Sequence, residues 1–246
     1  MLNVFIISLL AGLATALGGS LVLHSKKIGD KTLGFGLGFS GGVMIIIAFL
    51  SLLFKAIEFG TYAGAVVWFV IGALIMLALD FFVPHQYFIK EKRFESEKKL
   101  KFMRVGLLVA VGMTLHNFPE GAIVGIGYNV MPAFGLMLAF AIAMHNIPEG
   151  VAIALPLQAG GMKRRKIFII TLLSGLTETF GAMVAVLFLS AIPGIIPIAL
   201  ALTSGVMVYL SMDELIPLAT KSCNPHSISI GLIVGMAAAL ILEAIV

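Results

Sequence analysis

Two short polar strings inside apolar segments carry the residues of this sequence that are best suited to chemistry. One is His-Asn-Phe-Pro-Glu-Gly at 116–121, and the other is His-Asn-Ile-Pro-Glu-Gly at 145–150. In a helix, the histidine and glutamate of each string lie one turn apart, about 40° around the axis, and the asparagine lies near both. Each string therefore presents an imidazole, an amide and a carboxylate on one face. If the two helices run antiparallel, these faces can surround one or two metal ions with nitrogen and oxygen ligands.

Each string also contains a proline, Pro119 or Pro148. Proline has no N–H group, so it leaves the carbonyl one turn earlier without its helical partner and is expected to kink the helix. In lipid, such a carbonyl is tolerated where it is satisfied otherwise or lines a cavity. A structural kink is the alternative for either proline alone, but beside an acid and a histidine an ion pathway is the better interpretation.

Three carboxylates, those of Glu120, Glu149 and Glu178, are expected near the middle of a membrane. An ionised carboxylate there costs on the order of 2.5–3.5 kcal/mol, so it persists where water, a partner or a cation compensates it. No Lys or Arg occurs in the interior of the three segments that hold these glutamates. A bound dication is the expected counter-charge, and the alternative is a set of protonated glutamates that form hydrogen bonds inside a bundle.

The ligand types narrow the choice of ion. Imidazole, carboxylate and amide groups suit Zn²⁺, Fe²⁺, Mn²⁺, Co²⁺ or Cd²⁺, whereas the histidines argue against Mg²⁺ or Ca²⁺. The chain has a single cysteine, Cys223, which argues against a thiolate site for Cu⁺. A site that transports its ion must also release it, so a closed structural zinc site is not expected. The metal is therefore predicted to be a transported substrate, with no permanent cofactor.

The elements that must position these residues are membrane-spanning helices. The sequence is 60% hydrophobic and 11% charged, against about 45–50% and about 25% in soluble domains. A spanning helix needs about 20 mainly apolar residues. Eight segments meet this length, at about 3–23, 32–54, 61–83, 104–127, 132–157, 166–189, 194–219 and 226–246. The sequence thus predicts an all-α membrane protein, a single domain with eight transmembrane helices in one bundle and a cytoplasmic loop at about 84–103.

Charge and glycine add details to this bundle. All but one of the 16 Lys and Arg residues fall in loops on the same side, and the exception is Lys55. Such loops stay in the cytoplasm, which predicts that both termini are extracytoplasmic. The basic loops therefore need no nucleic-acid partner, and the lack of a basic residue before the first segment favours a retained span over a signal peptide. Glycines at four-residue spacing, at 34/38/42 and 121/125, are expected to let helices pack closely in lipid.

At the two polar strings the sequence resembles the ZIP (Zrt/Irt-like) family of metal transporters, in its bacterial zinc-uptake branch. The resemblance extends over essentially the whole chain and is supported by the strings at 41–44, 174–178 and 211–217. It implies an inner-membrane protein, often a homodimer, that moves divalent metal ions from one side of the bilayer into the cytoplasm. Zinc is the expected substrate, with iron, manganese, cobalt and cadmium as further substrates.

The resemblance also implies a binuclear metal site between segments 104–127 and 132–157. The residues that match one metal position are His116, Glu120, His145 and Glu149. Those that match the second are Asn117, Asn146 and Glu178, together with the two shared glutamates. Met44 is a candidate on the entrance side.

The chain departs from the family in two places. Many members have a His-rich loop after the third span, whereas only His85 is present here, so metal buffering by this loop is in doubt. Members often carry a ligand-type residue followed by Leu-Pro late in the second span, where this chain has Ser51 and then Leu53-Phe54. This difference predicts a weaker or altered second path into the site.

Three other interpretations stay open. An intramembrane zinc-dependent hydrolase would use Glu120 or Glu149 as a general base beside a zinc-bound water, but the sequence has no His-Glu-x-x-His string. A passive metal-selective channel would use the same residues as a carrier with alternating access. Asp213 and Glu214 either attract cations or are solvated acids at a helix end.

Overall fold

The computed structural model describes residues 1–24, 29–82, 94–188 and 194–245. Within these ranges the secondary structure is helical and contains no strand, which confirms the all-α prediction. The α-helices are α1 (Leu2–Leu23), α2 (Asp30–Ile47), α3 (Phe54–Phe59), α4 (Tyr62–Phe82), α5 (Phe94–Val130), α6 (Pro132–Ala159), α7 (Arg164–Leu187), α8 (Ile195–Tyr209), α9 (Ile216–Ser222) and α10 (Pro225–Ile245). Two π-helical segments complete the set, η1 (Ala48–Leu53) and η3 (Leu210–Leu215).

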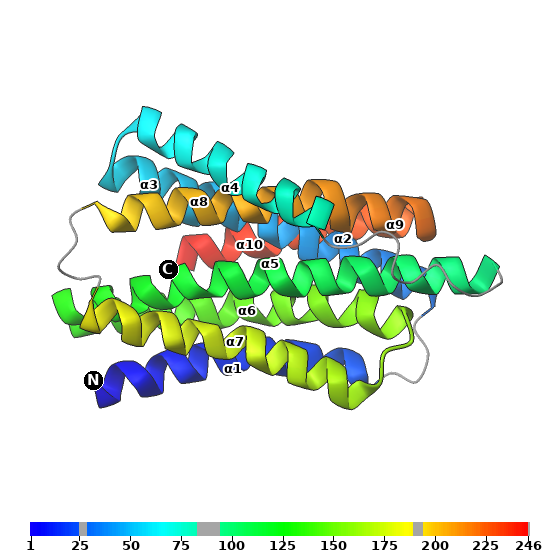
Figure 1. The fold of residues 1–246 in the computed structure, drawn as a ribbon, viewed down its shortest axis with the longest axis horizontal. Helices are drawn as coiled ribbons and strands as arrows, with labels where there is room; N and C mark the ends of the chain where they lie inside the picture. Colours follow the sequence, from blue (N-terminus) through cyan, green and yellow to red (C-terminus); the bar gives the residue numbers. More distant parts are fainter. Residues whose placement is uncertain (25–28, 83–93, 189–193, 246) are drawn as a thin grey trace.

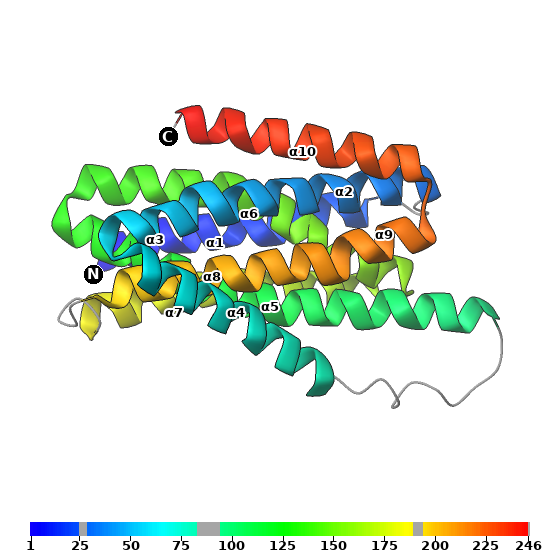
Figure 2. The ribbon, with the colours of Figure 1, turned by 90° about the horizontal axis from the view of Figure 1, so that it is seen from above.

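The helices form the eight rods that the hydropathy pattern predicts. Helices α2, η1 and α3 are continuous and make one rod, and α8, η3 and α9 make another. In the described part of the chain, seven rods are long and apolar enough to cross a membrane, and α4 adds a shorter apolar stretch, Tyr62–Ala78. Most of the rods run roughly along one direction, and α4 crosses them obliquely (Figures 1 and 2). This arrangement is that of an integral membrane bundle.

Two features differ from the expected spans. Helix α5 begins at Phe94, so the residues from 94 to 103 that were expected as loop are helical. Their Glu, Lys and Leu residues are good helix formers, which explains the extension beyond the apolar segment. Residues 84–93 of the expected loop, with His85, lie outside the described residues. The π segments were also not predicted, because a shift to i→i+5 hydrogen bonds leaves hydropathy unchanged.

The rods pack in two groups. Helices α1, α5, α6 and α7 contact one another and make up the lower part of Figure 1, and α4 packs on α8 in the upper part. Helix α10 packs mainly on α2, with an ideal Cβ on Gly38 only 2.4 Å from the carbonyl oxygen of Ile228. The predicted close packing at the glycines is therefore confirmed for this pair. Contacts of α2 with α6 and of α5 with α8 join the two groups.

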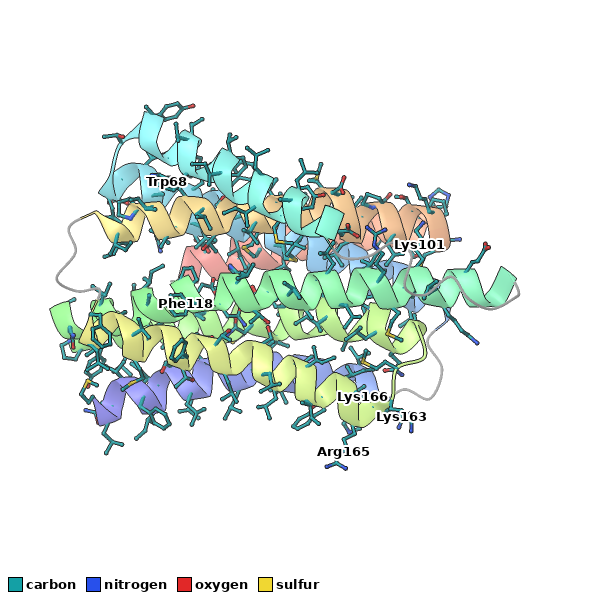
Figure 3. The ribbon with its side chains drawn as sticks, in the orientation of Figure 1. Trp68, Lys101, Phe118, Lys163, Arg165 and Lys166 are labelled. Carbon is teal, nitrogen blue, oxygen red and sulfur yellow. The ribbon has the colours of Figure 1, made fainter. Side chains whose placement is uncertain are left out.

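The outer surface of the bundle suits lipid. Large apolar side chains such as Leu2, Phe180 and Ile233 are exposed by 71%, 63% and 65%, whereas the polar side chains of the two strings are buried. Both termini lie at one end of the bundle (Figure 1). Basic side chains such as Lys101 and Arg165 lie at the other end (Figure 3), so the charge asymmetry read from the sequence is present in three dimensions.

Candidate metal centre

The two polar strings lie on neighbouring antiparallel helices. Helices α5 and α6 are joined at Met131, and they contact each other along their length. Each helix continues through its proline, Pro119 or Pro148, without a break. Because the connection is so short, the two strings meet near the middle of the bundle with opposite chain directions.

The strings face each other through two reciprocal histidine–glutamate pairs. His116 Nε2 lies 2.8 Å from Glu149 Oε1, and His145 Nε2 lies 2.9 Å from Glu120 Oε1. Glu120 Oε1 also lies 3.3 Å from His116 Nε2. The ligand atoms of His116, Glu120 and Glu149 are all within 4.8 Å of one another. The structure thus brings together the four residues that the family resemblance implied for one metal position.

The two asparagines and Glu178 form a second layer beside these pairs. Asn146 Nδ2 donates to Glu178 Oε2 at 2.6 Å and to the carbonyl of Ala11 at 3.0 Å. Asn117 Nδ2 donates to the carbonyl of Ser174 at 2.9 Å. The amide nitrogens therefore hold the strings to α1 and α7, and the amide oxygens are left for another partner.

Several buried polar atoms of this cluster lack a hydrogen-bond partner among the described residues. They are His116 Nδ1, Asn117 Oδ1, Glu120 Oε2, Asn146 Oδ1, Glu149 Oε2 and Glu178 Oε1. Burying such a group without a partner costs free energy, and each case calls for an explanation such as an ion. Five of the six atoms are oxygens, and all five can only accept when the carboxyl groups are ionised. A cation satisfies acceptor oxygens, so the donor set fits a metal ion.

The glycine that ends each string sets the distance to the next helix. An ideal Cβ on Gly121 would lie 1.7 Å from the carbonyl oxygen of Glu178, and one on Gly150 would lie 2.0 Å from that of Thr15. Only a residue without a side chain allows this approach of α7 to α5 and of α1 to α6. These glycines are packing residues, as the sequence indicates, and their packing places Glu178 beside the two strings.

Three other predicted residues lie apart from the cluster. Met44 is fully buried in the apolar core, and it is absent from the lining of the cavity that reaches the cluster. Asp213 and Glu214 lie in η3, inside a rod rather than at its end. Asp213 accepts a hydrogen bond from Tyr209 at 3.0 Å, and Glu214 is 8% exposed. Glu214 is therefore buried, whereas Asp213 is exposed, and neither acid lies at the end of its rod.

A cavity of about 260 Å³ leads from the cluster towards the end of the bundle that holds both termini. Glu120 and His145 lie at its inner end, and Phe59 of α3 and Ile196 of α8 lie at its outer end. Its polar lining also includes Ser51, Lys55 and Glu243. The cavity therefore borders the buried cluster on the side of this end of the bundle.

Glu243 is a residue that reasoning from the sequence missed. It lies in α10, and one of its carboxylate oxygens accepts a hydrogen bond from the hydroxyl of Ser51. The signal was an acid inside the last apolar segment, since ionisable residues within membrane spans are rare and functional by default. Ser51, which stands where family members often carry a ligand-type residue, is thus paired with a carboxylate from another helix.

Comparison with known proteins decides the family. The sequence profile described as ZIP zinc transporter matches residues 87–243. The chain belongs to the ZIP zinc transporter family. Similar proteins are named zinc transporter ZupT: that of Chlorobium chlorochromatii is 37% identical over 94% of this chain and 93% of its own length. That of Oceanobacillus iheyensis is 39% identical over 96% and 95%, and that of Xanthomonas axonopodis pv. citri is 40% identical over 94% and 89%.

Membership of the ZIP family agrees with the fold and with the chemistry of the cluster. The chain is an integral protein of the inner membrane that transports metal ions, and it is not an enzyme. The hydrolase alternative is thereby set aside. The paired strings that carried the resemblance are the residues that meet at the centre of this ZIP bundle.

Asn146→Ala should weaken zinc binding by at least about 10-fold. The family resemblance implies that Asn146 and Glu178 are both ligands, and Asn146 also holds Glu178 at 2.6 Å; loss of a partner that orients a metal ligand by itself typically costs about 10- to 100-fold. Zinc titration calorimetry on the purified protein measures the change. Asn3→Ala is the matched control, because the Asn3 amide donates only to the Tyr128 hydroxyl at an exposed position. Equal affinities of Asn146→Ala and wild type would contradict the role given to Glu178.

Proposed function

We propose that this chain carries divalent transition-metal ions, zinc foremost, across the membrane into the cytoplasm through a binuclear site between α5 and α6. The observation that supports it most is the cluster of buried acceptor oxygens around the two His–Glu pairs. Relatives that cover nearly the whole chain are named zinc transporters. Iron, manganese, cobalt and cadmium are proposed as further substrates, because the same ligand types suit them.

The first metal position would use the two imidazoles and the two glutamates that pair across the helices, His116, Glu120, His145 and Glu149. The second would use Asn117, Asn146 and Glu178, with Glu120 and Glu149 shared between the positions. The free oxygens of both asparagines and of Glu178 support this assignment. The metal is cargo in this proposal, so the site must bind it and also let it leave.

The route we propose begins in the cavity at the end of the bundle with both termini, taken as the extracytoplasmic side. The basic residues at the opposite end support this orientation, since Lys and Arg mark the cytoplasmic side. Release into the cytoplasm would require the group α1, α5, α6 and α7 to move against the helices that flank it. Such alternating access around a fixed site is common in secondary transporters.

Zinc uptake into proteoliposomes tests this proposal. Vesicles with the wild-type protein should take up zinc with saturable kinetics, and Glu149→Ala should reduce the rate to that of protein-free vesicles. Competition by the other dications gives the substrate range. Equal uptake by Glu149→Ala and wild type would refute the assigned site. Uptake that rises linearly with zinc concentration would instead favour a metal-selective channel.

The partners proposed for the transporter are the lipid bilayer and a second copy of the chain. The resemblance to an often dimeric family and the large apolar side chains on the outer surface support this choice. Native mass spectrometry from detergent micelles measures the oligomeric state. A mass of one copy at all protein concentrations would contradict the homodimer.

A further inference from the structure

The cavity that leads to the metal cluster contains a fixed positive charge. Lys55 is the one basic residue of the sequence that falls outside the loops on the basic side, and it lines this cavity. The other ionisable side chains in the lining are Glu120, His145 and Glu243. A cation at the mouth of a path for cations would repel the substrate, so its presence there needs a physical reason.

The geometry relates Lys55 to Glu243. The hydroxyl of Ser51 donates to the Glu243 carboxylate, and Lys55 follows Ser51 by one helical turn on the same rod. The lysine is therefore displaced from the carboxylate towards the outer end of the cavity, near Phe59. Both Lys55 and Glu243 are half-buried, and no described residue forms an ion pair with the Lys55 ammonium.

The lining between this pair and the metal cluster is apolar. It includes Ile123, Leu138 and Ile142. A carboxylate at the mouth of such a passage is costly to leave uncompensated. A flexible lysine side chain one turn away provides a positive charge that can approach the carboxylate or withdraw from it. Lys55 therefore shares the cavity with Glu243 without pairing with it in this structure, and only movement of its flexible side chain would bring the ammonium to the carboxylate.

Charge decides which cations can replace the ammonium. At equal distance, a dication is attracted to a carboxylate twice as strongly as an ammonium or an alkali ion. A dication that has lost part of its hydration shell can therefore outcompete Lys55 for Glu243, whereas a monovalent ion has no advantage of charge over the tethered ammonium, which is always present at high local concentration. The arrangement is a filter for ion valence.

We propose that Lys55 is a tethered counter-cation for Glu243 that divalent ions displace and monovalent ions do not, which makes the two residues a specificity filter at the mouth of the cavity. The inference rests on the proposed function, because it concerns the ions that reach the metal cluster. It assigns a role to two residues that lie outside the paired strings.

The test is zinc uptake into proteoliposomes by variants at both positions, with and without potassium. Lys55→Met should lower the KM for zinc by up to about fivefold, the upper limit for the interaction of two partly exposed charges. Potassium should then raise the KM of Lys55→Met and leave that of the wild type unchanged. Lys55→Gln should behave like Lys55→Met, and Lys55→Arg should behave like the wild type.

The double variant Lys55→Met/Glu243→Gln separates a direct partnership from a general charge effect. With Glu243→Gln alone, the KM for zinc should rise, and adding Lys55→Met should change it no further. The control is Lys166→Met, which removes an exposed charge at the opposite end of the bundle (Figure 3) and should leave the KM unchanged.

Each other outcome overturns the inference. A wild-type KM in both Lys55→Met and Lys55→Gln would show that the lysine does not face the ion path. An equal fall in KM in the Glu243→Gln background, or in Lys166→Met, would show that only net charge matters. If the wild type itself takes up no zinc, the proposed function fails; if it does and these variants do not differ from it, only the filter fails.

Discussion

Glu120→Ala should lower the rate of zinc uptake by at least about 100-fold. Mutation of a residue that only orients a metal ligand already lowers metal affinity or activity by about 10- to 100-fold, and loss of a ligand should cost more. Glu120 is the residue that contacts both histidines, at 2.9 Å from His145 and 3.3 Å from His116. Its carboxylate is fully enclosed and keeps one oxygen without a partner. In the proposed site, alanine at this position removes a ligand that both metal positions share, so neither position should fill.

Two measurements separate lost binding from lost folding. Zinc should raise the unfolding temperature of the wild type in detergent, because a ligand that binds only the folded state stabilises it, and Glu120→Ala should lose this shift. Glu97→Ala removes an exposed acid from the same helix and should keep both uptake and the shift. An undiminished zinc shift in Glu120→Ala would show that the carboxylate does not hold the metal.

Gly121→Ala should destabilise the bundle and impair uptake together. The added Cβ would lie 1.7 Å from the Glu178 carbonyl oxygen, so α7 would have to move away from α5. Overpacking of this kind typically costs about 1–3 kcal/mol and occasionally more, which for a chain of this length lowers the melting temperature by about 2–12 °C. Because α7 carries Glu178, zinc affinity should fall as well.

The control for this substitution is Gly29→Ala. Gly29 precedes α2 with a φ of −73°, and an added Cβ there has nothing within 4 Å. Its melting temperature in detergent should equal that of the wild type. If Gly121→Ala melts at the wild-type temperature, the close approach of α5 and α7 at this point is not tight, and the placement of Glu178 must have another cause.

Much of this architecture follows from sequence patterns alone. Apolar segments of membrane-spanning length correspond to the eight rods, because backbone groups in lipid must be satisfied within a helix. The paired His-Asn-x-Pro-Glu-Gly strings identified the cluster for a related reason. Acids and imidazoles are costly inside a membrane, so their presence in apolar segments indicates a function.

The sequence was least informative where a contact joins distant segments. Glu243 and Ser51 are paired between α10 and the rod of α2, and neither residue indicates its partner by spacing. The two π segments fall inside apolar runs and change which side chains face inward without changing hydropathy. For Met44, the sequence motif suggested a position on the entrance side, but the structure places its side chain in the apolar core.

The sequence by itself determined the helices, their number, the asymmetry of charge and the ligand types of the site, because all of these depend on local composition and on the cost of polar groups in lipid. Only the tertiary structure decided that His116 pairs with Glu149 and His145 with Glu120, across the helices. It also placed Lys55 and Glu243 in the cavity that reaches them. Such pairings depend on how far each helix is rotated and displaced against its neighbours. Close glycine contacts constrain these positions, and no short stretch of sequence encodes them.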